Sequence, residues 1–198
     1  MIKIKFHIQP TALIFFLWTL FVNEGNIGII TLLAAFFHEC GHILAAKRMH
    51  IPLRSLRLDL LGARLEASGR MLSYTEEWLL CAAGPLVSLT LSAAAAPLWH
   101  FSSSTIAFSC VSLLLGCLNL LPIRTFDGGR MMECWLCSFL SVRIAGNIMR
   151  IISFVFLFLL WATSVYFLLR VGDGLSLLLF SMSLFFRFFS LESEVCHL

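Results

Sequence analysis

The stretch AAFFHECGHILAAK, residues 34–47, decides both the fold class and the chemistry expected of this chain. Ten of its fourteen residues are apolar or glycine, yet His38, Glu39 and His42 lie in the middle. Burying an ionisable side chain in apolar surroundings costs free energy unless it is paired, hydrogen-bonded or bound to a metal. The sequence therefore predicts that these three side chains share a task that offsets the cost.

The whole chain is as apolar as this stretch. Its 198 residues are 60% hydrophobic and 13% charged, with a mean hydropathy of +0.93. Soluble domains have about 25% charged residues, so the composition predicts a membrane protein surrounded by a lipid bilayer. The net charge of +3 is spread along the chain, which argues against a nucleic-acid partner. Seven cysteines, an odd number mostly in apolar segments, do not indicate a disulfide framework.

Six apolar segments are candidate membrane spans, because a transmembrane helix needs roughly 20 apolar residues. The expected spans are 8–22, 27–47, 78–100, 104–121, 150–169 and 175–189. Short connections between them predict one domain, residues 1–198, of all-α class. No small-residue cleavage site follows Lys3 and Lys5, so the first span is expected to be a retained anchor.

The distribution of basic residues predicts the orientation of these spans. Every Lys and Arg except Arg170 falls on one side of the six-span arrangement. The positive-inside rule then places both termini in the cytoplasm. His42 precedes Lys47 by five residues, so the polar cluster is expected to lie near the cytoplasmic boundary and to open toward it.

The segment between the second and third spans, IPLRSLRLDLLGARLEASGRM at 51–71, alternates apolar and charged residues. Leu56 and Leu58 alternate with Arg57 and Asp59, and a glycine turn follows. This pattern predicts a small amphipathic β-hairpin at the membrane interface, with a surface loop as the alternative. A strand edge of this hairpin could hold an unwound substrate peptide by β-augmentation.

The HExxH spacing at residues 38–42 predicts a zinc site. On a helix, His38 and His42 are four residues apart and project from one face, with Glu39 beside them. Two imidazole nitrogens can then reach one Zn²⁺, and Glu39 can take a proton from water.

A third ligand is expected from the segment NLLPIRTFDGGR, residues 119–130, because a catalytic zinc usually has three protein ligands. Pro122 is expected to end the fourth span, and two glycines allow an unusual backbone path. Such a broken helix can carry Asp127 back toward the histidines. Glu133 is the alternative ligand.

The motifs HECGH (38–42) and NLLPIRTFDGG (119–129) resemble the HExxH and NxxPxxxxDG signatures of the site-2 protease family of intramembrane zinc metalloproteases. AAGPLVS (82–88) is similar to a further family marker, which often ends in Asn where this chain has Ser88. The resemblance implies that His38, His42 and Asp127 ligate zinc and that Glu39 is the general base. It also implies that Asn119 lines the substrate path or assists the tetrahedral intermediate.

Within that family the chain looks most similar to the stage IV sporulation protein FB group, since its longest non-spanning stretch is too short for a PDZ domain. The resemblance implies a membrane-associated substrate such as a sigma-factor precursor, regulatory membrane proteins as partners, and a bacterial cell or forespore membrane as location. Two alternatives use the same polar cluster. A metal transporter would tolerate Glu39→Gln, and an inactive scaffold would survive His38→Ala.

Overall fold

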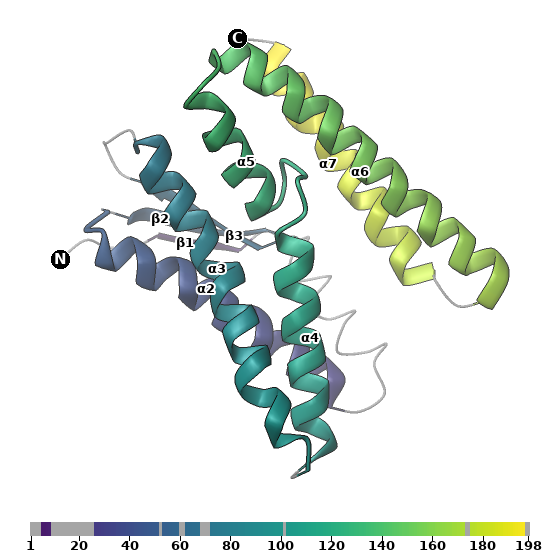
Figure 1. The fold of residues 1–198 in the computed structure, drawn as a ribbon. Coiled ribbons are helices and arrows are strands. Elements are labelled where there is room, and N and C mark those ends of the chain that lie inside the picture. Colours follow the sequence, from purple (N-terminus) through teal and green to yellow (C-terminus); the bar gives the residue numbers. More distant parts are fainter. Residues whose placement is uncertain are drawn as a thin grey trace. The chain divides into compact units, whose positions relative to one another are not determined.

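The computed structural model describes residues 5–8, 26–51, 53–59, 62–67, 72–100, 102–172 and 175–196. The chain divides into two compact units, Met1–Leu120 and Leu121–Leu198. The first contains β1 (Lys5–Ile8), α2 (Ile27–Arg48), β2 (Leu53–Asp59), β3 (Gly62–Ala67), α3 (Tyr74–Ala95), the 3₁₀ helix η1 (Ala96–His100) and α4 (Ser103–Asn119). The second contains α5 (Asp127–Cys137), α6 (Val142–Val171) and α7 (Leu175–Cys196) (Figure 1).

Helix α2 packs against α3 and α4 through a stripe of residues at i, i+4 spacing. The stripe consists of Ile30, Ala34, His38, His42 and Ala46, all of them buried. Gly41 lies beside this stripe, where an added Cβ would be 2.7 Å from the carbonyl oxygen of Ala83 in α3. Small residues allow such close approach of helices in membranes, so the histidines face α3 at short range.

Helix α3 begins at Tyr74, four residues before the expected span, because Ser73 and Glu76 form a capping box. The Glu76 amide donates to Ser73 Oγ at 3.2 Å, and the Ser73 amide donates to Glu76 Oε2 at 3.0 Å. These bonds satisfy backbone donors that a helix start would otherwise leave open. Hydropathy alone places the start later, because it counts the two acidic residues of the first turn against the span.

Helix α4 packs against α3 with serines at the interface. Ser109 Oγ donates to the Ser92 carbonyl oxygen at 2.9 Å and lies 3.3 Å from Ser92 Oγ. Interhelical serine bonds of this kind are typical of membrane helix pairs. The helix ends at Asn119 with Leu120 as its C-cap, two residues before Pro122, a position where proline prevents the helix from continuing.

Three strands form one sheet in the order β1-β2-β3. Strand β1 pairs with β2 in parallel, with Phe6 opposite Leu56, and β2 pairs with β3 in antiparallel, with Leu56 opposite Leu65. The expectation of helices and one two-stranded element therefore needs correction, because β1 adds a third strand. Its four residues, KFHI, precede an apolar run, and such a short segment carries too little periodicity to be recognised.

The second unit contains a helix, α5, that was not predicted from the sequence. Helix α6 has 30 residues and begins at Val142 instead of residue 150, and α7 continues to Cys196 instead of residue 189. Hydropathy windows stop at charged residues such as Arg143, whereas the helix continues through them. The two helices pack together, with Ser164 Oγ and Ser181 Oγ 3.2 Å apart in a fully buried contact.

Three described helices are long and apolar enough to cross a membrane: Ile27–Arg48, Tyr74–Leu98 and Val142–Arg170. Two shorter helices, Ser103–Asn119 and Leu175–Ser190, are also apolar. Among the residues that the structure describes, the expectation of six spans is thus reduced to three long helices and two short ones. The expected first span, 8–22, lies outside the described residues except for Ile8, which belongs to β1.

Candidate metal centre

The structure brings His38 and His42 together as the sequence predicted. Their side chains are 4% and 6% exposed, and their Nε2 atoms lie 3.3 Å apart. Two nitrogens that each bind one tetrahedral zinc at about 2.05 Å are separated by about 3.3 Å. The observed separation therefore matches the one that a shared zinc ion requires.

His42 is held by the backbone of α3. Its Nδ1 lies 2.8 Å from the carbonyl oxygen of Leu80. A carbonyl oxygen can only accept, so Nδ1 must carry the proton and donate. In the neutral ring the lone pair is then on Nε2, the atom that faces His38.

His38 is held by a side chain of α3. Its Nδ1 lies 2.9 Å from Ser88 Oγ, and Ser88 is only 1% exposed. Both imidazoles are thus anchored through Nδ1, which leaves both Nε2 atoms directed at one point. Metal-bound histidines are usually anchored in this way.

Gly84 provides the space in which the two Nε2 atoms meet. A Cβ added there would be 2.8 Å from His38 Nε2 and 2.5 Å from His42 Cε1, and it would overlap His42 Nε2. Leu80, Gly84 and Ser88 follow one another at i, i+4, i+8, so a single face of α3 serves both histidines. In the sequence, Gly84 and Ser88 are recognisable only as parts of a family marker, and Leu80 is not recognisable as a partner of His42. The four-residue spacing, equal to that of the histidines, was the available signal.

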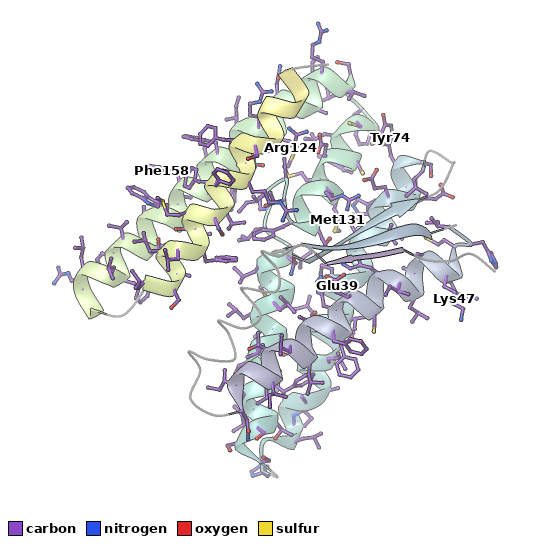
Figure 2. The ribbon with its side chains drawn as sticks, turned by 180° about the vertical axis from the view of Figure 1, so that it is seen from behind. Glu39, Lys47, Tyr74, Arg124, Met131 and Phe158 are labelled. Carbon is purple, nitrogen blue, oxygen red and sulfur yellow. The ribbon has the colours of Figure 1, made fainter. Side chains whose placement is uncertain are left out.

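Glu39 follows His38 on α2, and Figure 2 shows it in the middle part of that helix, with Lys47 nearer one end. The residue is half-buried, and its Oε2 atom is buried. A carboxylate in this environment is suited to exchange protons with a reacting group rather than with bulk water.

Asp127 lies in the second unit as the first residue of α5. The preceding turn is closed by the Phe126 amide, which donates to the Ile123 carbonyl oxygen at 2.8 Å. A Cβ on Gly129 would overlap that carbonyl group and lie 2.7 Å from the Arg124 nitrogen. Glycine at position 129 therefore lets the turn fold back over the start of α5, which fixes the local position of Asp127.

Arg124 ties this turn to two helices of the same unit. Its backbone nitrogen donates to Ser153 Oγ of α6 at 3.0 Å, and its Nη2 lies 2.8 Å from Glu133 Oε1 of α5. Glu133, the alternative zinc ligand, is therefore engaged in an ion pair with Arg124. Figure 2 labels Arg124 in this turn and Met131 in α5.

Asn119 is the last residue of α4. Its Nδ2 donates to the Leu115 carbonyl oxygen at 3.0 Å, one turn back in the same helix. The described contact is thus structural, and it commits one of the two donor hydrogens of the amide.

The predicted ligands are divided between the two compact units, with His38 and His42 in the first and Asp127 in the second. Two imidazoles and a carboxylate are a donor set typical of zinc sites with an open position. The two anchored histidines, whose Nε2 atoms lie 3.3 Å apart, fit such an ion.

Comparisons with known proteins agree with this chemistry. Residues 82–163 match the family model of Peptidase family M50, a range that contains Gly84, Ser88 and Asp127 but not the histidine pair. "Putative zinc metalloprotease Rip3" from two strains of Mycobacterium tuberculosis is 33% identical over 123 residues. The match covers 57% of this chain and 31% of the relative, so the chain spans about a third of the length of these relatives.

A solved structure has the same fold. The chain is similar to the "Site-2 Protease from Methanocaldococcus jannaschii" with a TM-score of 0.67 and 19% sequence identity. The likeness covers 96% of this chain and 91% of that protein. The family model and the curated relatives thus show similarity to zinc metalloproteases, and the solved structure shows a shared fold.

Proposed function

We propose that this chain is a membrane-embedded zinc metalloprotease of Peptidase family M50, which hydrolyses a peptide bond in or near the membrane-embedded part of a protein substrate. The observation that carries the proposal is the buried pair of histidines whose Nε2 atoms lie 3.3 Å apart while both Nδ1 atoms are anchored to α3. The close approach of α3 at Gly84, where an added Cβ would overlap His42 Nε2, restricts where the two rings can lie.

In this proposal His38 and His42 hold the zinc through Nε2, and Asp127 supplies the third ligand. When bound, zinc supplies a Lewis acid that polarises a carbonyl and makes water acidic enough to ionise near neutral pH. The proposal joins residues of both compact units in one protease domain, residues 1–198. It is supported by the donor set, and by the ion pair with Arg124 that engages Glu133 elsewhere.

Glu39 acts as the general base and then as the general acid. Its carboxylate accepts a proton from the attacking water and later donates that proton to the leaving amine. Water adds to the carbonyl carbon, the C–N bond breaks, and the products are a carboxylic acid and an amine. No covalent intermediate with the protein is required.

The substrate, location and orientation belong to the same proposal. The resemblance of the motifs favours a membrane-tethered regulator such as a sigma-factor precursor, with regulatory membrane proteins as partners. The basic residues at the end of α2, Lys47 and Arg48, favour an active site that opens to the cytoplasm and both termini on that side, in a bacterial cell or forespore membrane. Asn119 would line the substrate path with the part of its amide that the bond to Leu115 leaves available.

The test is co-expression of the chain with candidate membrane-tethered transcription-factor precursors. Wild type is expected to cleave a precursor, and Glu39→Gln is expected to leave it intact while the purified variant keeps its zinc. Gly146→Ala is a matched control, because a Cβ at this position meets nothing within 4 Å. Cleavage that persists in Glu39→Gln would contradict the protease, and metal transport that persists in this variant would favour the transporter.

The edge of the sheet is the proposed place where an unwound substrate is held. Strand β2 is central, so a proline at Leu58 would disrupt the sheet itself, whereas β3 is an edge strand. Successive residues of a strand direct their N–H groups to opposite sides. Of the variants Ala63→Pro and Arg64→Pro, one is therefore expected to block substrate cleavage while leaving the sheet intact. Unchanged cleavage in both would exclude substrate binding at this edge.

A further inference from the structure

We propose that Ser88 is a positioning residue for His38: its hydroxyl oxygen accepts the hydrogen of Nδ1 and thereby holds the ring with the Nε2 lone pair directed at the metal. The inference rests on the proposed metal site. It assigns a role to the residue at which this chain departs from the family marker.

The contact is direct and shielded from water. Ser88 Oγ lies 2.9 Å from His38 Nδ1, and both side chains are almost fully buried. Water therefore cannot replace the hydroxyl readily as a partner of the ring. A neutral imidazole carries one proton, so the partner of Nδ1 decides whether Nε2 has a lone pair to offer.

The two histidines differ in how this is achieved. The partner of His42 is the Leu80 carbonyl oxygen, an obligate acceptor that belongs to the backbone. The partner of His38 is a hydroxyl, which can accept or donate. A serine in a helix can direct its own hydrogen to the carbonyl one turn back, and its oxygen then accepts from the ring. Only the His38 anchor can therefore be removed by a side-chain substitution.

Helix α4 restricts the position of the Ser88 side chain. An added Cβ on Gly116 would lie 3.2 Å from Ser88 Cβ and 3.1 Å from two atoms of Leu89. The backbone of α4 thus lies directly against this part of α3. Ser88 has little room to move, and an anchor that cannot move fixes the ring that it binds.

Ser92 provides the matched control, one turn farther along α3. It is also a buried serine at the interface with α4, where its Oγ lies 3.3 Å from Ser109 Oγ. Removing its hydroxyl perturbs the same helix pair without removing a partner of either histidine. The pair Ser88→Ala and Ser92→Ala therefore separates positioning of the ligand from packing of the helices.

The experiment measures zinc affinity of the full chain in detergent by competition with a chromogenic chelator, together with the visible spectrum of the Co²⁺ form and thermal unfolding without metal. We expect Ser88→Ala to bind zinc ~10–100-fold more weakly and to change the Co²⁺ spectrum, as loss of a histidine anchor typically does. Ser92→Ala should match wild type in both. Ser88→Cys keeps the shape of serine but accepts hydrogen bonds weakly, so it should also lose affinity.

The outcomes distinguish this inference from the proposed function. Wild-type affinity in both Ser88→Ala and Ser88→Cys overturns the role of Ser88 while the metal site stands. An equal loss in Ser88→Ala and Ser92→Ala also overturns it, because packing would then explain the effect. A wild-type chain that binds no zinc overturns the proposed function and this inference together.

Discussion

Gly84→Ala tests how closely α3 controls the metal site. The new methyl group would be 2.5 Å from His42 Cε1 and 2.8 Å from His38 Nε2, whereas non-bonded heavy atoms prefer at least about 3.5 Å. His38 must therefore move by roughly 0.7 Å, and His42, whose Nε2 the methyl group would overlap, by more than roughly 1 Å. Metal–ligand distances tolerate about ±0.2 Å, so the two rings can no longer share one ion.

The folded state should lose some stability, because the rings that must move are buried and anchored, and overpacking of this kind typically costs about 1–3 kcal/mol. Part of this cost is offset, because alanine is more favourable than glycine within a helix by roughly 1 kcal/mol. We expect a modest decrease of the unfolding temperature in detergent and a fall in zinc affinity of more than about 100-fold, beyond the loss of one anchoring group. Gly146→Ala, whose Cβ meets nothing within 4 Å, should leave zinc affinity unchanged. Wild-type affinity in Gly84→Ala would refute the geometry described for this site.

Three further predictions concern stability and the turn before α5. Gly129→Ala should destabilise the second unit by about 1–3 kcal/mol, because the overlap with Ile123 is with backbone; an unfolding curve equal to that of wild type would contradict this. Ser73→Ala should lower the free energy of unfolding by about 1 kcal/mol through loss of the capping box, measured by denaturant titration, with no change in zinc content. Arg124→Ala should lower the free energy of unfolding by less than about 1 kcal/mol, since the ion pair of Arg124 with Glu133 is partly exposed. The same variant should cleave less substrate, because this pair holds the turn before Asp127. Full cleavage would show that the pair is dispensable.

The sequence predicted the histidine pair of the first unit better than the boundaries of its helices. The spacing of His38 and His42 was sufficient to predict that their rings meet, because a helix places residues i and i+4 on one face. It could not predict the partners of those rings. Leu80 and Ser88 lie on another helix, and only the packing of α3 against α2 brings them into contact.

The second unit was harder to predict for a related reason. The sequence indicated that a helix is interrupted before Asp127, but it did not indicate that α5 starts there. Helix α5 is short and mixes polar and apolar residues, so a search for long apolar segments does not detect it. The ion pair of Glu133 with Arg124 was not predicted either. This pair depends on the turn that Gly129 permits, which no local propensity describes.

X-ray absorption at the zinc edge of the purified wild-type chain tests the central claim most directly. The claim predicts about one zinc per chain with nitrogen and oxygen ligands at about 2.0–2.2 Å and the multiple-scattering signature of two imidazoles. That signature should be lost from His42→Ala. A spectrum with sulfur ligands at about 2.3 Å, or a folded wild-type chain that takes up no zinc, would contradict it.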